Sequence, residues 1–429
     1  MKKTIPIREA LSAKNDGKIV SIRGWVHRER GSNKFKFFVI RDVSGTIQAI
    51  VKAEDKKLFK IAEDATMESS VIVSGKIRKD ERAPTGYELQ VKDLEVVGKA
   101  APFPISRDKS EEFLLDVRHL WVRSRKLTNV FKIRSTVVGA IHDYFRKNDF
   151  FETQVPVLTP TACEGGSSLF KVDYFGDTVY LTQSWQLYSE ALTASLEKLY
   201  TIAPSFRAEK SRTPRHLTEY WHAEMEAIYC DLPQLMKYGE ELVSHVCQEV
   251  ARKNVEELKE LGQDPAELKK VKAPFPKITY KEALDILAKN GMKVKYGKDL
   301  RTLEERELVK HFEKPVFVTN YPKEIMAFYK PEDPENPGTA LCFDLIIPEV
   351  GELIGGSVRD LDVDAMKKVL KEEGEDLSTY DWYFDTRKYG AVPHAGFGMG
   401  VERLVMWICG LEHIRDTIPF PRTINRNAP

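Results

Sequence analysis

Short runs of β-branched and aromatic residues dominate the first hundred residues of the chain. Turn sequences separate these runs at Gly31-Ser32-Asn33, Ser44-Gly45 and Pro84-Thr85-Gly86. One segment of helical character, residues 53–66, follows the third run. The pattern predicts a domain of five strands and one helix. The expected strands are residues 18–25, 35–41, 46–51, 69–77 and 88–97.

Five strands with a helix between the third and the fourth follow the order of an OB-fold, a small barrel that often binds single-stranded nucleic acid. Aromatic side chains stack on bases and basic side chains meet phosphates. Because Phe37 and Phe38 point to opposite faces of one strand, we expect one of them in the barrel core. The first hairpin carries both kinds of residue: Arg23, Arg28, Arg30, Lys34, Phe35, Lys36, Phe37 and Phe38.

A second domain is expected after a linker. The proline-containing stretch within residues 101–118 does not continue a strand, so we predict domains at 1–100 and 119–429. Residues 130–148 have helical periodicity, and the strand expected at 150–158 contains Pro156. Proline is disfavoured in a central strand, so this strand is expected at an edge or a dimer contact. Residues from about 232 to 315 read as a helical insertion.

Residues 201–231 place charges of both signs on two apolar segments that flank a polar loop, as in an antiparallel hairpin. Arg207 and Glu209 lie two residues apart and are expected on one face of the first strand, as are Glu224 and Glu226 on the second. Four such charges suit a polar ligand such as a nucleotide better than a core. The alternative is a salt-bridged sheet surface.

Composition narrows the class of protein. Among the 429 residues, 31% are charged and 42% hydrophobic, which is typical of a globular protein, and the net charge is only +1. Nucleic-acid binding would therefore require local basic patches. The five cysteines have no zinc-type spacing and indicate a reducing compartment. No apolar run is long enough for a membrane span, so a cytoplasmic location is expected.

Three motifs in order carry a family resemblance. They are Pro156 after the long helix, the sequence FRAE at 206–209, and GFGMGVER at 396–403. Together, behind an OB-fold, they resemble the class II aminoacyl-tRNA synthetases. The sequences EGGSSLF, QSWQLY, RHLTE, IGGSVR and the late Pro421-Arg422 resemble the aspartyl/asparaginyl subgroup over essentially the whole chain. The resemblance implies an α+β fold, an antiparallel catalytic sheet of six to seven strands flanked by helices, and a homodimer.

The resemblance also implies roles for individual residues. Arg207 and Arg403 are the expected catalytic residues, and both are expected to bind ATP. Asp344 and Glu352 would hold Mg²⁺, which prefers oxygen ligands. The other implied ATP ligands are Glu209, His216, Tyr220 and Glu352. The implied amino-acid ligands are Glu164, Ser184, Gln186, Arg207, Glu224, Ser357 and Arg359. The implied anticodon contacts are Arg28, Phe37, Gln48 and Glu88.

Charge favours asparagine over aspartate as the amino acid and hence tRNA(Asn) as the tRNA. In aspartyl enzymes, as the family pattern implies, an arginine and a lysine face the side-chain carboxylate. This chain keeps Arg359 but has Ser189 in place of the lysine, and it carries Glu224 where the aspartyl pattern has a shorter aspartate. We therefore predict that Arg359 donates to the amide oxygen and Glu224 accepts from the amide nitrogen. The alternative is that Glu224 only pairs with a neighbouring arginine.

Three other functions stay open from the sequence. The first is an aspartyl enzyme, including one that charges both tRNAs. The second is an asparagine-forming paralogue with the same catalytic fold, against which the N-terminal barrel argues. The third is an RNA-binding protein with an inactive catalytic domain, against which the intact Arg207, Glu209, Glu402 and Arg403 argue.

Overall fold

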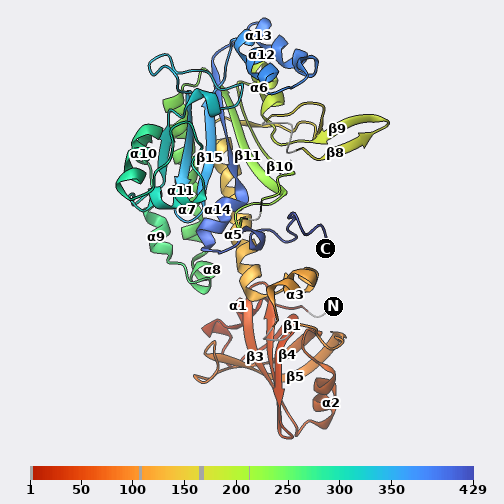
Figure 1. Ribbon diagram of the computed structural model, residues 1–429. Coiled ribbons are helices and arrows are strands. Elements are labelled where there is room, and N and C mark those ends of the chain that lie inside the picture. The colour runs from red at the N-terminus through yellow and green to blue at the C-terminus, as the bar shows by residue number, and fades with distance from the viewer. Residues whose placement is uncertain (1–2, 106–108, 164–168, 212) are drawn as a thin grey trace. The chain divides into compact units, whose positions relative to one another are not determined.

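The computed structural model describes residues 3–105, 109–163, 169–211 and 213–429 (Figure 1). The chain divides into two compact units, Met1–Leu115 and Asp116–Pro429. Within the described ranges, no helix combines the length and the apolar character that crossing a bilayer requires.

The first unit is a closed five-stranded barrel with the strand order β1-β2-β3-β5-β4, which confirms the predicted OB-fold. Alternation along β2 sends Phe38, 2% exposed, into the core and leaves Phe37 half-buried on the outside. The short helices α1 (Ile7–Ala10) and η1 (Ala13–Asn15) precede the barrel. The barrel elements are β1 (Ile19–Gly31), β2 (Phe35–Asp42), β3 (Gly45–Lys52), α2 (Lys56–Asp64), β4 (Ser70–Lys79) and β5 (Tyr87–Gly98).

The second unit is built on an eight-stranded sheet with the order β12-β13-β14-β15-β16-β11-β10-β6. The pairings from β13 to β10 are antiparallel, whereas β12 and β6 pair in parallel with their neighbours. The expected antiparallel sheet is therefore right for the six central strands and wrong at both edges. The strands are β6 (Phe151–Glu152), β10 (Lys198–Phe206), β11 (Glu219–Ile228), β12 (Lys277–Thr279), β13 (Val316–Thr319), β14 (Cys342–Ile347), β15 (Gly351–Val358) and β16 (His394–Gly400).

The strand expected at residues 150–158 is divided. Only Phe151–Glu152 joins the edge of the large sheet, as β6. Beyond Pro156, which has no N–H to donate, Leu158–Thr159 forms β7 in a separate three-stranded sheet. That sheet has the order β7-β9-β8, with β8 at Lys171–Tyr174 and β9 at Asp177–Leu181. The prediction of an edge position is thus confirmed, but that of one continuous strand is wrong.

Helices α5 (Arg125–Lys147), α7 (Leu232–Lys253) and α14 (Val401–Cys409) cover one face of the large sheet (Figure 1). Strand β11 shows how the two faces differ. Ala223, Met225 and Ala227 belong to the apolar core under the helices, while Glu224 and Glu226 alternate with them and face the other side. The helix-covered face therefore holds the core and the opposite face holds the polar groups.

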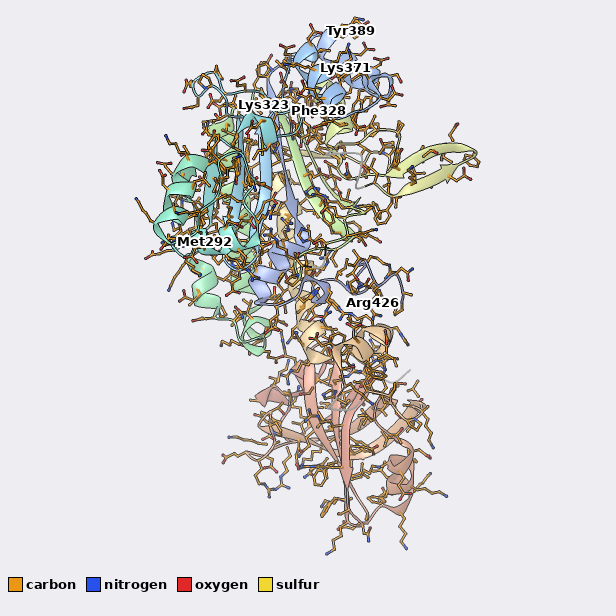
Figure 2. All side chains as sticks on the ribbon, in the orientation of Figure 1. Met292, Lys323, Phe328, Lys371, Tyr389 and Arg426 are labelled. Atoms are coloured by element: carbon orange, nitrogen blue, oxygen red, sulfur yellow. The ribbon has the colours of Figure 1, made fainter. Side chains whose placement is uncertain are left out.

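A smaller apolar cluster holds the helices after β15 against α6 (Gln186–Leu196). Phe328 packs on Tyr383 of α13 (Asp381–Lys388) with ring centroids 6.1 Å apart. Figure 2 labels Phe328 and, close by in the view, Lys371 of α12 (Val363–Glu372). This packing brings α13 side chains to α6. The remaining helices are α3 (Glu111–Asp116), α4 (Arg118–Trp121), α8 (Val255–Glu260), α9 (Pro265–Lys270), α10 (Tyr280–Lys289), α11 (Thr302–Val309), η3 (Lys323–Ile325), α12 (Val363–Glu372), η4 (Leu377–Tyr380), α13 (Asp381–Lys388) and η5 (Ile414–Asp416).

Candidate active site

The hairpin of β10 and β11 forms the floor of the candidate site. The two strands pair from Lys198 with Ala227 to Phe206 with Glu219. Arg207 and Glu209 lie just beyond the end of β10 rather than within the strand, so that part of the expectation is wrong. The Arg207 N–H still donates to the Thr218 carbonyl at 3.0 Å, which continues the hairpin by one bond.

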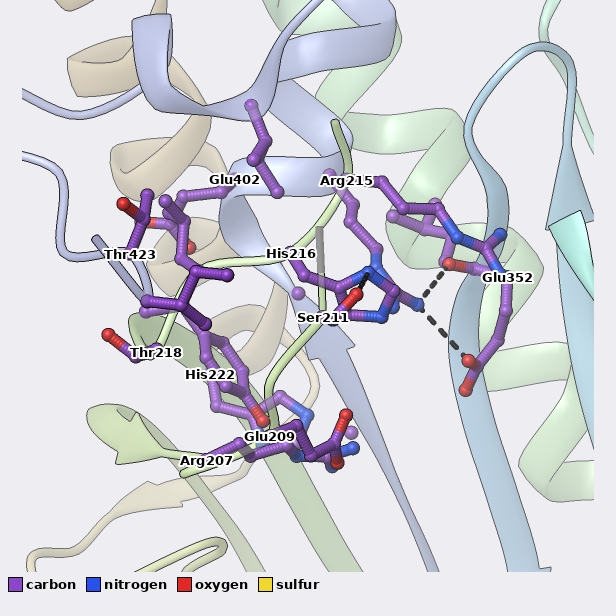
Figure 3. A pocket seen from close by; sticks show the side chains of 18 residues that line it. Arg207, Glu209, Ser211, Arg215, His216, Thr218, His222, Glu352, Glu402 and Thr423 are labelled. Atoms are coloured by element: carbon purple, nitrogen blue, oxygen red, sulfur yellow. Dashed lines mark hydrogen bonds and ion pairs between the residues drawn. The ribbon is translucent and has the colours of Figure 1, made fainter. Parts of the chain in front are cut away.

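A first pocket of about 740 Å³ opens above this hairpin (Figure 3). It brings together every described residue that the sequence pattern implied for ATP. Glycines of β16 and residues near the C-terminus complete the wall. The polar and charged lining side chains include Arg207, Glu209, Arg215, His216, Tyr220, His222, Glu352, Glu402, Arg403 and Thr423.

Three arginines, three glutamates and two histidines line the first pocket. Arg403 Nη1 donates to the Glu352 carbonyl at 2.6 Å and lies 3.1 Å from its carboxylate, as the dashed lines in Figure 3 show. Burial and the charges of Arg403, Arg215 and Arg207 lower the pKa of His216 to about 4. His216 is therefore uncharged at neutral pH and is available for hydrogen bonds.

A buried carboxylate from helix α11 supports this pocket. Glu305 is 4% exposed and pairs with Arg215, and its other oxygen accepts from the Glu352 N–H at 3.2 Å. A side chain on Gly351, whose φ is +91°, would collide with both Arg215 and Glu305. The region 232–315, predicted only as a helical insertion, thus contributes a group that touches the pocket lining.

A second pocket of about 620 Å³ shares Arg207, His222, Glu352 and Gly398 with the first, so the two form one continuous cleft. It brings together every described residue that the sequence pattern implied for the amino acid. Its lining includes Ser184, Gln186, Glu224, Glu226, Tyr329, Lys330, Asp344, Ser357 and Arg359.

Arg359 is buried in the second pocket and is held from three sides. Its Nε and Nη2 donate to the Glu226 carboxylate at 3.0 and 2.9 Å, and Nη1 donates to Ser357 Oγ at 3.0 Å. The Tyr329 ring lies 5.3 Å from its guanidinium carbon. Gly396 makes room for this pair, because an added Cβ would lie 2.1 Å from a Glu226 oxygen and 2.6 Å from Arg359 Nη2. The charge of Arg359 is therefore compensated within the protein.

Glu224 lines the same pocket with a different set of contacts. It accepts from the Trp185 N–H at 3.0 Å and from the hydroxyl of Ser184, and His222 Nδ1 lies 3.5 Å away. The arginine expected beside it, Arg359, pairs with Glu226 instead. These contacts leave Glu224 as an acceptor on the pocket wall.

Asp344 and Glu352 meet where the two pockets join. They lie on the neighbouring strands β14 and β15, and a Cβ on Gly355 would lie 3.6 Å from Asp344 and 2.9 Å from Glu352. Burial and the charge of Glu352 raise the pKa of Asp344 well above its usual range. Two carboxylates that repel each other and line the same pocket fit the oxygen ligands that Mg²⁺ prefers. No group of three or more metal-ligating side chains occurs among the described residues.

The four residues implied for the anticodon share the outer face of the barrel. In strand register, Arg28 faces Val39, Val39 faces Gln48, and Gln48 faces Glu88. Phe37 lies two residues before Val39 on the same face, with the Arg30 guanidinium 5.1 Å from its ring centre. The row therefore combines an aromatic platform with cationic and hydrogen-bonding groups.

Comparison with known proteins identifies the family. The model of class II tRNA synthetases (D, K and N) matches residues 110–424, and that of the OB-fold nucleic acid binding domain matches residues 20–97. An asparagine–tRNA ligase of Thermoplasma acidophilum is 48% identical over 99% of this chain and 100% of its own. The asparaginyl-tRNA synthetase of Pyrococcus horikoshii, solved with asparaginyl-adenylate, superposes with a TM-score of 0.96 at 44% identity, covering 100% of both chains.

The chain belongs to the asparaginyl-tRNA synthetases of class II. The counterpart from Entamoeba histolytica is similar at 32% identity, with a TM-score of 0.88 over 100% of both chains. The prediction of asparagine ligation is thus confirmed, and the aspartyl, asparagine-forming and inactive alternatives are set aside.

Several synthetase residues in the cleft escaped sequence reasoning. Glu226 was noted as a charge on the hairpin face but not as the partner of Arg359. Lys330 and His222 line the second pocket without any motif that marks them. Glu305 had one available signal, a run of glutamates at the start of a helix, which is common on surfaces. Glu164 lies outside the described residues.

Proposed function

We propose that the chain activates asparagine with ATP in the two joined pockets and transfers it to tRNA(Asn). The observation that carries the proposal is the contrast within one cleft. The first pocket presents arginines to a polyanion, whereas the second pocket presents an arginine already paired with Glu226. A triphosphate fits the first and an uncharged amide side chain fits the second.

In the ATP half, Arg207 and Arg403 bind phosphate oxygens. The guanidinium fork suits phosphate geometry and is always charged. Glu209 accepts from the adenine amino group and Tyr220 stacks on the ring, while the neutral His216 hydrogen-bonds the outer phosphate. These roles are supported by the common pocket of all five residues.

Asp344 and Glu352 would hold Mg²⁺ beside the phosphates. The bound ion would neutralise phosphate charge during adenylate formation. The repulsion between the two carboxylates, which raises the pKa of Asp344, supports a cation between them.

In the asparagine half, Arg359 donates to the amide oxygen and Glu224 accepts from the amide nitrogen. Ser184, Gln186 and Ser357 shape the wall around that side chain. Aspartate would place a second carboxylate against Glu224, which is costly in a poorly hydrated pocket. Sites that read such hydrogen-bonding groups discriminate by ~10⁴-fold or more.

Arg207 lines both pockets, which suits the chemistry at their junction. An oxygen of the asparagine carboxylate attacks the α-phosphorus, and pyrophosphate leaves as the new P–O bond forms. The 3′-hydroxyl of the terminal adenosine of the tRNA then attacks the activated carbonyl carbon, and AMP leaves. Neither step requires a nucleophilic side chain, so positioning and charge stabilisation supply the catalysis.

The barrel binds the anticodon through the row of Arg28, Gln48 and Glu88 with Phe37 beside it. The support is their common outer face and the exposed basic neighbours. We propose residues 1–100 as the anticodon-binding domain, 101–118 as the linker and 119–429 as the catalytic domain.

We also propose a homodimer that uses α5 and β6. Strand β6 lies at the sheet edge and presents Phe151, which is 57% exposed. Exposed edges with apolar side chains favour pairing with a second copy. Sedimentation at micromolar concentration should give twice the 49.1 kDa chain mass, and a fully active monomer would contradict this. The five buried free thiols support a reducing, cytoplasmic location.

The direct test of function is ATP–pyrophosphate exchange followed by charging of tRNA(Asn). Exchange should depend on asparagine and not on aspartate, and charging should require tRNA(Asn) in addition. Equal exchange with both amino acids would overturn the proposed selectivity.

A further inference from the structure

Behind the second pocket lies a buried carboxylate that the reaction described above does not use. Glu190 of α6 is 3% exposed. One of its oxygens, Oε2, accepts from Tyr383 Oη at 2.8 Å and lies 3.1 Å from His394 Nε2. The same oxygen pairs with Arg387. Three elements, α13, β16 and α6, thus converge on one carboxylate oxygen.

The other oxygen of Glu190 faces the pocket lining. Oε1 accepts from Gln186 Nε2 at 2.9 Å and lies 3.8 Å from Arg359 Nε. Gln186 and Arg359 both line the second pocket. Glu190 therefore joins two pocket residues to a support that extends away from the ligand.

Glu190 is an anion at neutral pH. Burial alone would raise its pKa, but the charge of Arg387, the hydrogen bond with His394 and the charge of Arg359 lower the pKa well below its usual range. Arg359 then lies between two carboxylates, because Glu226 contacts it on the other side. With Glu224 included, three carboxylates lie near the guanidiniums of Arg359 and Arg387 at this end of the cleft, whose lining also includes Lys330.

We propose that Glu190 is a positioning residue that sets amino-acid selectivity: it orients Gln186 and Arg359, and its charge reduces the attraction of Arg359 for a substrate carboxylate. The proposal rests on the proposed function, in which Arg359 reads the amide oxygen of asparagine. A compensated arginine still donates hydrogen bonds to an amide but offers little net charge to aspartate.

The test uses Glu190→Gln in the full chain, with ATP–pyrophosphate exchange measured for asparagine and for aspartate. The variant keeps the size of the side chain and removes its charge. The ratio of kcat/KM for asparagine to that for aspartate should fall on the order of tenfold or more, while KM for ATP stays within about twofold. Equal losses for both amino acids would show a purely structural role and overturn the proposal.

The double variant Glu190→Gln/Arg387→Gln removes one charge of each sign. The charge balance around Arg359 returns to that of the wild type, so the selectivity ratio should recover. A ratio that stays as low as in the single variant would contradict the charge argument.

If Glu190→Gln does not fold, the single variant Arg387→Gln tests the proposal instead. It removes a positive charge, so the ratio should rise above that of the wild type, and an unchanged or lower ratio overturns the proposal. Glu240→Gln is the matched control, because Glu240 is 8% exposed and accepts from the Phe275 N–H at 2.8 Å, away from both pockets. Its ratio should equal the wild-type ratio.

The selectivity of the wild type distinguishes a failure of the proposed function from a failure of this inference. A wild type without preference for asparagine would overturn the proposed function and this inference together. A selective wild type with an unchanged ratio in Glu190→Gln would overturn this inference alone.

Discussion

The two halves of the cleft hold their arginines in opposite ways. In the first pocket, Arg403 contacts the partly exposed carboxylate of Glu352 and Arg215 pairs with the buried Glu305. Burial and the charges of Arg403, Arg215 and Arg207 lower the pKa of His216 beside them. In the second pocket, Arg359 lies against Glu226 on one side and Glu190 on the other. Both halves are polar, but Arg403 and Arg215 of the first each contact one carboxylate, whereas Arg359 of the second lies between two.

The difference matches the charge of the two ligands. A triphosphate brings several negative charges, and guanidinium groups bind phosphate oxygens strongly in a site with little water. An asparagine side chain brings none, so a compensated arginine suffices to orient it and offers little to aspartate. We expect the number of carboxylates around each arginine, rather than the presence of arginine, to decide which ligand each half accepts.

The largest expected effect comes from removing positive charge where the halves meet. Arg207→Ala should lower kcat for ATP–pyrophosphate exchange by ~10²–10³-fold, because a preorganised charge at the reacting phosphate is lost. Exchange kinetics measure the effect. Arg306→Ala, an exposed arginine on α11, is the control and should retain wild-type exchange. A fall in kcat of less than about threefold would show that Arg207 does not stabilise the reacting phosphate.

A change in the barrel should leave both halves of the cleft intact. Phe37→Ala should weaken the use of tRNA in charging by about 5- to 150-fold, since stacking on one base contributes ~1–3 kcal/mol. Exchange without tRNA should stay at the wild-type rate. Ile19 is a barrel residue that is 72% exposed, so Ile19→Ala should change neither charging nor exchange. A parallel fall in exchange would show that the barrel residue acts on the catalytic unit.

Glu305 holds two residues of the first pocket, Arg215 and Glu352, and a substitution there tests this role. Glu305→Gln weakens the pairing with Arg215 and the hydrogen bond to the Glu352 N–H, so KM for ATP should rise about tenfold, equivalent to ~1.4 kcal/mol. KM for asparagine should change little. Glu307→Gln on the same helix, whose carboxylate pairs with Lys310, is the matched control. An equal rise in both KM values would argue for general loosening of the cleft.

The smallest effect concerns pH. Because the pKa of His216 is lowered to about 4 in the folded protein, the folded state resists a proton that the unfolded chain accepts below about pH 6.5. The stabilisation is therefore present above pH 6.5 and is lost as pH falls towards 4. His216→Gln should show a shallower fall in Tm over that window than the wild type. His311→Gln is the control, and identical slopes for all three proteins would exclude the effect.

The sequence motifs name many residues that line the cleft but not the buried charges behind them. Arg207, Glu209, Arg403 and Arg359 occur in compact motifs, because the residues of each motif lie on one strand or turn that lines the cleft. Glu190, Arg387 and His394 are far apart in the sequence and meet only through tertiary packing, and a buried charge has no local signature.

Element length explains the errors in the fold. The barrel strands are 8 to 13 residues long and alternate clearly, so their order was predictable. Strands β6 and β12 have 2 and 3 residues, too few for any periodicity, and their parallel pairing depends on neighbours far along the chain. Glu305 was missed for a different reason. The charged sequence of α11 is typical of a helix on the protein surface, so it does not indicate that one of its glutamates is buried.

The most direct measurement of the charge-balance account compares asparagine and aspartate in ATP–pyrophosphate exchange by the wild type and by Glu224→Gln. The account predicts that the wild type prefers asparagine by ~10⁴-fold or more, because aspartate would meet the Glu224 carboxylate beside a compensated Arg359. Glu224→Gln removes that repulsion, so the preference should fall by at least ~10-fold, mainly through faster use of aspartate. A wild type that activates both amino acids equally, or a variant with unchanged preference, would contradict the account.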